Sequence, residues 1–437
     1  MNAIFTISAN NYMALALTLC DSIRATGGGA DVFVFLADEP PPGGLPSKPG
    51  VAIVPAREIG MPAFADMAFK YDVVEFSTSI KPFCIEHLLA KGYDKILYVD
   101  PDMAFFRPVS ELFAELEGKD AMVTPHVLDL AQDEAGAMEP GRFLVSGVFN
   151  MGFFGLRRTP GALAFLGWWK HKLSYACFAD RQDGLFTDQK WMEFAPIYLG
   201  DGLRILRDPG YNVAWWNLHE RAIARKGGAF GIRYHGGDAP LSLMHFSGYD
   251  PMRTDVANRR IEKNAGLRLV EGTPLGDLFG DYRVAVLKNG HETFRTIPYA
   301  YDRFENGDGI AKFHRRLYRR LTDRRTVYRF EDEYQRETRE AIVRAGHEYP
   351  DPFSCAAGGY WDFLRCNGLL GSRKGGAAAD RINVDAHSQA FLRKTKVLAN
   401  LMRLAKRVLG LNRYLMLMRF LEKYARDEMQ VLLIRDL

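Results

Sequence analysis

Two carboxylates stand two positions apart at Asp100 and Asp102, in the run Leu97-Tyr-Val-Asp-Pro-Asp102. The apolar residues before them predict a strand, so both carboxylates come at its carboxyl end, where open α/β sheets bind ligands. Two such oxygens can hold Mg²⁺ or Mn²⁺, and a cation there can neutralise a leaving diphosphate. Asp-Pro-Asp is also typical of a turn, because Asp and Pro dominate turns. The motif alone leaves both interpretations open.

Short apolar runs alternate with helical patterns over residues 1–250, which predicts an α/β domain with a mostly parallel sheet. A helix is expected at about 12–26, and another after Thr159, which caps it with Pro160 in the first turn. Strands are expected at residues 3–8, 31–37, 51–54, 95–100, 121–124, 147–156 and 241–246.

Beyond about residue 253 strand signals thin out, apart from 282–287, and a mainly helical extension is expected. Residues 371–379 are rich in Gly and Ala and predict a flexible linker. Apolar residues then recur at helical spacing among basic ones, as in an amphipathic helix or helical pair. We therefore expect three parts: an α/β domain at 1–265, a mainly helical extension at 266–385 and a basic amphipathic tail at 386–437.

The order of polar motifs over residues 1–250 resembles that of the GT-A fold nucleotide-sugar glycosyltransferases, most closely the retaining family 8 enzymes of the glycogenin and bacterial lipopolysaccharide galactosyltransferase type. Each motif has a structural alternative, such as a helix start or a packed histidine, but turns and core packing do not explain their shared order. The motifs besides Asp-Pro-Asp are Ser8-Ala-Asn-Asn-Tyr12, Ser77-Thr-Ser-Ile-Lys81, Phe149-Asn-Met-Gly152, Thr187-Asp-Gln189 and His245-Phe-Ser-Gly248.

The resemblance implies a Rossmann-like GT-A domain, with a mostly parallel mixed sheet, that transfers a hexose from a nucleoside-diphosphate sugar, expected to be UDP-linked. Asp100, Asp102 and His245 would hold the cation, and the His245 nitrogen suits Mn²⁺ better than Mg²⁺. The residues that would bind the nucleotide sugar are Ser8, Asn11, Tyr12, Lys81, Tyr98, Asp100, Asn150, Gly152, Asp188 and Gly248.

Three residues would take part in the chemistry by the same resemblance. Lys81 would lie near the diphosphate and donor sugar, although a solvated lysine at a helix start is an equal alternative. Asp188 would bind hydroxyls of the donor sugar, and Gln189 would lie under its anomeric carbon. Transfer would retain configuration, with the leaving phosphate oxygen taking the acceptor proton. Inversion, with Asp188 or Glu193 as base, is the variant left open.

The sequence departs from the family at two positions. Ala9 stands where related enzymes often carry Asp, and Asp250 stands where they carry a lysine on the β-phosphate. Lys81, Arg253 or a residue of the helical extension would then supply that cation, or the contact is absent.

Two further segments carry polar and aromatic groups. Residues 208–221 include Trp215 and Trp216 and resemble the loop that GT-A enzymes place beside the acceptor, with a buried aromatic cluster as the alternative. His126 and Asp129 follow an expected strand and would approach the donor sugar.

Composition limits the partners. The formal net charge of +4 is too near balance to indicate nucleic acid. Five widely spaced cysteines indicate reduced thiols, and the first residues lack a secretory pattern, so cytoplasmic residence is expected. The acceptor would be a glycan, lipid-linked or protein group. The basic tail would contact an anionic membrane at its inner face, or pack on its own domain or a second copy.

Two rival functions remain. A sugar nucleotidyltransferase would need a Gly-rich basic loop after the first strand, where this chain has Ala9-Asn-Asn-Tyr12. A non-catalytic sugar- or nucleotide-binding protein with a transferase fold would be favoured by loss of a metal ligand, yet all three candidates are present.

Overall fold

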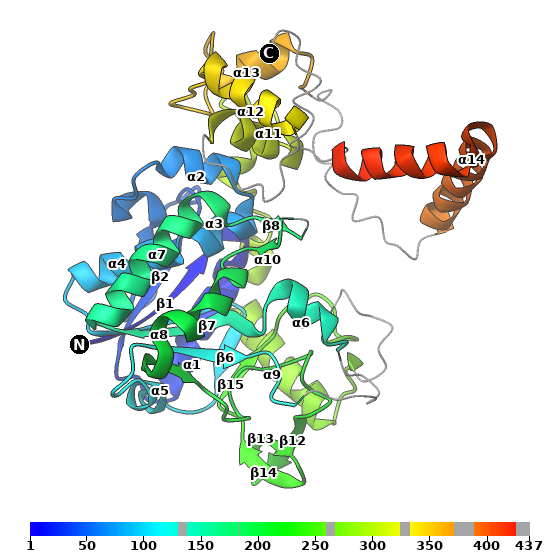
Figure 1. Ribbon diagram of the computed structural model, residues 1–437. Helices are drawn as coiled ribbons and strands as arrows, with labels where there is room; N and C mark the ends of the chain where they lie inside the picture. The colour runs from blue at the N-terminus through cyan, green and yellow to red at the C-terminus, as the bar shows by residue number, and fades with distance from the viewer. Residues whose placement is uncertain (130–137, 182, 259–266, 324–332, 371–388, 425–437) are drawn as a thin grey trace. The chain divides into compact units, whose positions relative to one another are not determined.

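The computed structural model describes residues 1–437 except 130–137, 182, 259–266, 324–332, 371–388 and 425–437 (Figure 1). The chain forms two compact units. The first comprises Met1–Pro62 and Val73–Ala300, and the second comprises Ala63–Asp72 and Tyr301–Leu437.

A seven-stranded sheet in the order β10-β6-β7-β4-β1-β2-β3 forms the centre of the first unit. The antiparallel strand β7 separates the parallel pair β10–β6 from the parallel strands β4, β1, β2 and β3. This confirms the expected α/β fold with a mostly parallel mixed sheet. The strands are β1 (Asn2–Ser8), β2 (Asp31–Leu36), β3 (Val51–Pro55), β4 (Lys95–Val99), β6 (Ala121–Pro125), β7 (Phe149–Arg157) and β10 (Leu203–Ile205).

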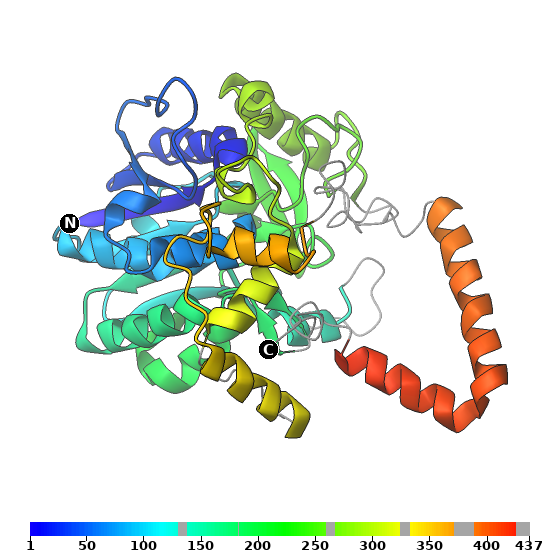
Figure 2. The same ribbon diagram turned by 90° about the horizontal axis from the view of Figure 1, so that it is seen from above.

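Helices pack on both faces of this sheet (Figure 2). Leu97 and Val99 of β4 join a core with α1 (Met13–Ala25) and α5 (Ser110–Glu115). On β7, Phe154 contacts Trp169 of α7 (Pro160–Ala176). Alternating strand positions therefore face different helical layers. The expected cap is confirmed, since the Thr159 side chain accepts a hydrogen bond from the Ala162 N–H.

The remaining short elements of the first unit connect these layers and build its edges. They include η1 (Asn10–Tyr12), η2 (Ala56–Ile59), α3 (Val73–Ser79), α4 (Lys81–Ala90), α6 (Gly141–Ser146), β8 (Ala179–Asp180), β9 (Leu185–Phe186), η3 (Lys190–Phe194), α8 (Ala195–Leu199) and η4 (Gly200–Gly202). An antiparallel meander that the sequence did not indicate comprises β12 (Ala222–Lys226), β13 (Ala229–Tyr234) and β14 (Gly237–Pro240).

A small second sheet carries the strands that matter for the site. In it β15 (Leu243–His245) pairs in parallel with β11 (Val213–Ala214) and antiparallel with β5 (Met103–Phe105). Because β5 directly follows Asp102, and His245 pairs with Met103, the register brings His245 beside the Asp-Pro-Asp turn.

The strand expected at 282–287 is wrong, because these residues belong to α9 (Pro274–Lys288). Leu278, Phe279, Tyr282 and Val286 are buried at helical spacing, and they pack with residues of α1 and β15. Since α9 and α10 (His291–Phe294) pack this way, the first unit extends to Ala300, whereas the expected division came at residue 265.

The second unit is mainly helical, as expected for the C-terminal region. Its core includes Phe69, Tyr318 and Tyr360, and the buried guanidinium of Arg315 donates to the carbonyls of Phe69 and Tyr71. The expected linker at 371–379 lies outside the described residues. The helices are α2 (Phe64–Lys70), α11 (Lys312–Thr322), α12 (Glu333–Ala345), α13 (Tyr360–Cys366) and α14 (Gln389–Tyr424), which is kinked at Gly410.

Candidate active site

The three expected metal ligands come together. Asp100 directly follows β4, Asp102 precedes β5, and His245 ends β15. His245 Nε2 lies 3.1 Å from Asp102 Oδ1 and 3.8 Å from Asp100 Oδ2. Within the described part of the chain, this is the group of His, Cys, Asp and Glu side chains whose ligand atoms all lie within 4.8 Å of one another.

The donor set suits a divalent cation. Burial lowers the pKa of His245, but the carboxylates of Asp102 and Asp100 outweigh burial and raise it overall. These carboxylates thus draw a positive charge to this point. One imidazole nitrogen and two carboxylates fit Mn²⁺, and also Mg²⁺ with less preference for the nitrogen.

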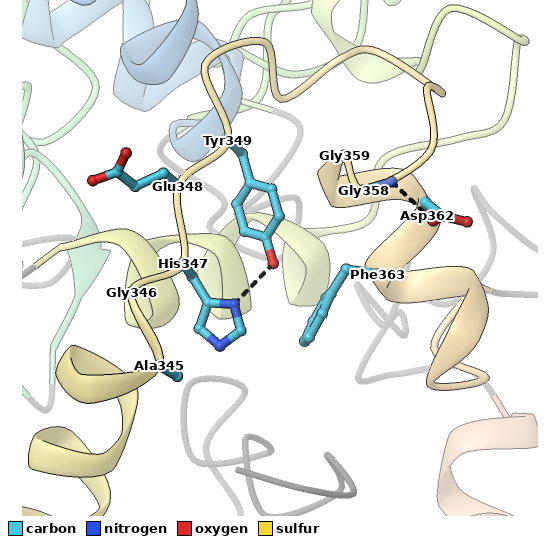
Figure 3. Close-up of a pocket in the computed structure, with 9 residues that line it drawn as sticks. All are labelled: Ala345, Gly346, His347, Glu348, Tyr349, Gly358, Gly359, Asp362 and Phe363. Atoms are coloured by element: carbon cyan, nitrogen blue, oxygen red, sulfur yellow. Dashed lines mark hydrogen bonds between the residues drawn. The ribbon is translucent and has the colours of Figure 1, made fainter.

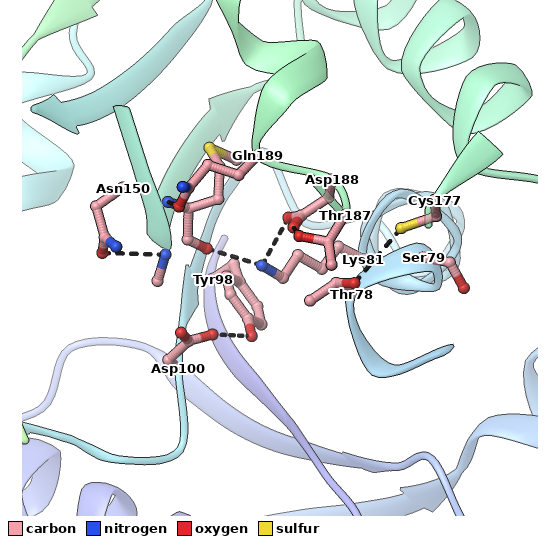
Figure 4. Close-up of polar contacts among 12 residues, drawn as sticks. Thr78, Ser79, Lys81, Tyr98, Asp100, Asn150, Cys177, Thr187, Asp188 and Gln189 are labelled. Carbon is pink, nitrogen blue, oxygen red and sulfur yellow. Dashed lines mark hydrogen bonds and ion pairs between the residues drawn. The ribbon is translucent and has the colours of Figure 1, made fainter. Parts of the chain in front are cut away.

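Tyr98 lies beside Asp100 (Figure 4), which with Asp102 and His245 forms the metal corner of the site. Its hydroxyl donates a short hydrogen bond to Asp100 Oδ1, which leaves Oδ2 on the side of His245. Burial, followed by the charge of Asp100, raises the pKa of Tyr98 well above its usual value, so the hydroxyl keeps its proton. Tyr98, which the sequence placed in nucleotide binding, is in contact with a metal-ligand candidate and orients it.

Lys81 is buried rather than solvated at its helix start. Its ammonium donates to Asp188 Oδ2 at 2.7 Å and to the Met151 carbonyl at 2.7 Å, and it lies 4.2 Å from the centre of the Tyr98 ring. Two of the three N–H groups of the ammonium thus donate to protein oxygens, and the charge lies over the face of an aromatic ring. Lys81 therefore neutralises Asp188 and holds it against β7.

Asp188 and Gln189 follow β9 and face the middle of β7. Burial raises the pKa of Asp188, and the adjacent charge of Lys81 opposes the rise. The Gln189 amide oxygen accepts from the Met151 N–H at 3.1 Å, and its NH₂ donates to the Ser146 carbonyl at 2.8 Å. Thr187 has φ 49° and bonds to Asp188, so it does not cap a helix there.

Gly152 lets Asn150, His245 and Asp100 lie close to one another. A Cβ at position 152 would lie 2.8 Å from Asn150 Oδ1, 2.8 Å from His245 Cε1 and 2.9 Å from Asp100 Oδ2. The Gly152 carbonyl also accepts from the Asp100 N–H at 2.7 Å. Glycine at this position therefore lets the metal corner and Asn150 meet on β7.

The segment at residues 8–12, expected to bind the nucleotide sugar, is held by a residue that was not predicted from the sequence. Asp38, after β2, accepts hydrogen bonds from the Asn10 backbone and side chain at 3.2 and 3.0 Å. Asn11 Oδ1 is buried without a partner, whereas Tyr12 is exposed. Ser8 is buried and its hydroxyl donates to the Ala9 carbonyl. The signal for Asp38 was its place after an apolar strand, as for Asp100.

The other candidates divide between this site and its surroundings. Trp216 is buried, with ring centres 5.4 Å from His126 and 5.2 Å from His245. Asp129, which was expected to approach the donor sugar, instead pairs with the exposed His235 at 2.8 Å. Gly248 has φ 72°, which favours glycine in the turn after His245.

Lys81 and Arg253, the two named candidates for the cation that would contact the β-phosphate, are both paired with carboxylates. Arg253 pairs with Asp255 at 2.8 Å, and Lys81 donates to Asp188 and to the Met151 carbonyl.

A pocket of about 380 Å³ lies within the second unit (Figure 3). The rings of His347, Tyr349 and Phe363 line it, and the Tyr349 hydroxyl contacts His347 Nδ1 at 3.2 Å. None of the sequence candidates lines this pocket.

No protein-family model matches the chain. The uncharacterized protein YfnD of Bacillus subtilis (strain 168) is 25% identical over 208 residues, which are 45% of this chain and 62% of YfnD. The uncharacterized protein YfnF of the same organism is 21% identical over 252 residues, 57% of this chain and 82% of YfnF. The chain thus matches less than two thirds of the length of YfnD.

Solved structures with some similarity include two sugar transferases. The galactosyltransferase LgtC, in complex with donor and acceptor sugar analogs, aligns with 12% identity and a TM-score of 0.38, over 65% of this chain and 96% of LgtC. Mouse xyloside xylosyltransferase 1 aligns with 12% identity and a TM-score of 0.35, over 56% of this chain and 97% of its own.

Proposed function

We propose that this chain is a metal-dependent glycosyltransferase that moves a hexose from a nucleoside-diphosphate sugar, UDP-linked, to an acceptor hydroxyl. The observation that carries the proposal is the cluster of Asp100, Asp102 and His245, with ligand atoms within 4.8 Å of one another. It lies at the carboxyl end of β4, the edge where α/β sheets bind ligands.

Asp100, Asp102 and His245 would hold Mn²⁺ or Mg²⁺, with the diphosphate oxygens filling the remaining positions. A cation so bound neutralises charge on a departing diphosphate. Because Lys81 is engaged with Asp188 and Arg253 with Asp255, we infer that neither of these two residues shares this task. The enzyme should then depend strictly on its metal.

Asp188 and Asn150 are the polar groups proposed to bind the donor sugar. Asp188 accepts hydrogen bonds from hydroxyl groups most strongly when it is a carboxylate. The ammonium of Lys81 stabilises that negative charge in a buried place. Gln189, fixed by Met151 and Ser146, is proposed to lie under the anomeric carbon and to stabilise its developing positive charge.

Retention is the favoured outcome. The alternative base Glu193 accepts a hydrogen bond from the Val148 N–H at 2.6 Å, and Asp188 is paired with Lys81. Both carboxylates are thus held by contacts within the protein, and we propose neither of them as the base. The leaving phosphate oxygen is proposed to accept that proton on the face from which it departs.

Titration of UDP with and without Mn²⁺ tests the binding half of the proposal. We expect binding that requires Mn²⁺ and is lost in Asp102→Ala. A hydrolysis screen over nucleotide sugars then identifies the donor. Binding of UDP without metal, or donor turnover that is unchanged in Asp102→Ala, would contradict the metal assignment.

The tail is proposed to bring the enzyme to an anionic membrane at the cytoplasmic face. α14 carries nine Lys or Arg residues against the single acidic residue Glu422. Leu401, Leu404 and Val408, one helical face of its first half, are exposed. Basic and apolar faces on one helix favour the interface of anionic lipids. No helix among the described residues is long and apolar enough to cross a bilayer.

A further inference from the structure

His126 is buried beside Asn150, one of the two residues proposed to bind the donor sugar. It directly follows β6 and is 6% exposed. Its Nδ1 lies 3.2 Å from the Val148 carbonyl oxygen, and its Nε2 lies 3.3 Å from Asn150 Nδ2. Both ring nitrogens therefore have polar partners, one on each side.

These partners specify one tautomer. A carbonyl oxygen only accepts hydrogen bonds, so Nδ1 carries the proton toward Val148. The NH₂ group of an amide only donates, so Nε2 presents a lone pair to Asn150. Burial lowers the pKa of His126 to about 4, which keeps the imidazole neutral at physiological pH. A protonated ring would set two N–H groups against each other at Nε2.

Asn150 is oriented by this contact. One of its N–H groups donates to His126, and its Oδ1 accepts from the Gly152 N–H at 3.2 Å. A flip of the amide would set its oxygen against the Nε2 lone pair of His126. The held orientation leaves one N–H and one lone pair on Asn150, which together match a sugar hydroxyl that donates and accepts.

The imidazole cannot shift easily. The His126 N–H donates to the Val148 carbonyl at 3.0 Å, and its own carbonyl accepts from Asn217 Nδ2 at 2.8 Å. The Trp216 ring packs edge-on against it, with centroids 5.4 Å apart. Trp216 also contacts His245, so the same loop braces the metal corner and the His126 ring.

We propose that His126 is a positioning residue of the transfer site: as a neutral, Nδ1-protonated imidazole it fixes the amide of Asn150 so that one N–H and one lone pair face the donor sugar. This role rests on the proposed function, because it takes Asn150 to bind that sugar. It adds a residue outside the motifs by which the sequence resembles the GT-A enzymes.

The hydrogen-bond half of the proposal can be tested without any substrate. Long-range ¹H–¹⁵N spectra of histidine-labelled protein report the tautomer of each ring, and the signals absent from His126→Phe identify His126. We expect an Nδ1-protonated, neutral ring that stays so from pH 8 to pH 5. An Nε2-protonated or a titrating ring in this range would overturn the proposal.

The functional half is tested with the donor sugar found in the hydrolysis screen. His126→Phe keeps the ring but removes the acceptor, and we expect kcat to fall about tenfold, the worth of one hydrogen bond. His126→Gln, whose amide oxygen can accept from Asn150, should recover part of the loss. His87→Phe is the matched control, because His87 packs against Phe35 outside the site.

A double-mutant cycle separates positioning from general damage. In an Asn150→Ala background, His126→Phe should cause no further loss of kcat, because its partner is already gone. Full additivity, or unchanged kcat in the single variant, would overturn the proposal. Equal Mn²⁺-dependent UDP affinity in all variants shows that they are folded. If the wild type binds no UDP, the proposed function fails. The tautomer measured by NMR then still shows whether His126 accepts a hydrogen bond from Asn150.

Discussion

The ammonium of Lys81 lies 2.7 Å from a carboxylate oxygen of Asp188, and both side chains are only 2% exposed. The two residues are far apart in the sequence and come from α4 and the segment after β9. A charge pair buried this deeply is costly to form and very costly to break on one side. It joins the start of α4 to the region proposed to lie under the donor sugar.

Lys81→Met should destabilise the fold, because it leaves the Asp188 carboxylate buried and uncompensated. We expect a loss of about 3 to 5 kcal/mol in the free energy of unfolding, measured by urea denaturation. The double variant Lys81→Met/Asp188→Asn should recover much of that loss. Equal destabilisation in the single and double variants would mean that the pair is not coupled.

Asp102→Ala and His245→Ala should each weaken Mn²⁺ binding by about 100-fold or more, since each removes a direct ligand candidate. Electron paramagnetic resonance of free Mn²⁺ measures the affinity without any substrate. Glu86→Ala is the control, because Glu86 pairs with Lys170 on an exposed surface. Unchanged affinity in both ligand variants would exclude this cluster as the metal site.

Gly152→Ala should disrupt the site, because the new Cβ would approach Asn150, His245 and Asp100 to within 2.9 Å. We expect weakened Mn²⁺ binding together with lower thermal stability. Gly280→Ala offers the comparison, since an added Cβ on the exposed side of α9 meets nothing within 4 Å. That variant should keep Mn²⁺ affinity and gain up to about 1 kcal/mol from helix propensity.

Acid should unfold the protein partly through His126. Its pKa is lowered by burial from 6.5 to about 4, so below pH 6.5 the unfolded chain binds a proton that the folded chain does not. Stability from this group is complete above pH 6.5, falls as the pH drops, and is fully lost below about 4. The loss is on the order of 3 kcal/mol. Urea titrations between pH 7 and 4 should show a shallower decline for His126→Phe than for the wild type, and parallel curves would contradict this.

The tail should bind vesicles that contain anionic lipid and not neutral ones. Each Lys or Arg near such a surface contributes about 1 kcal/mol, so added salt should release the protein. Replacing Leu401, Leu404 and Val408 by Ser should weaken co-sedimentation, whereas Val284→Ser, an exposed change in α9, should not. A concentration-dependent dimer that is lost in the Ser variant, with no vesicle binding, would instead make this face an interface between copies.

Local patterns were enough for much of the fold. The strands near 3–8 and 95–100 and the capped helix after Thr159 follow from apolar runs and short-range capping, which neighbouring residues determine. The prediction of a strand at 282–287 was wrong, because a short apolar stretch fits a strand or a buried helix equally well. Packing against α1 and β15 settles it as a helix.

The sequence by itself determined the candidate ligands: Asp100 and Asp102 follow from residue type and from their place after an apolar strand, and His245 follows from the resemblance to the GT-A enzymes. Only the tertiary structure decided that the pairing of β15 with β5 sets His245 beside Asp102. It also decided that Lys81 is a buried partner of Asp188 and that Asp38 anchors the Asn10 loop. These contacts depend on strand register and on burial, which join residues distant in the chain and leave no mark in local spacing.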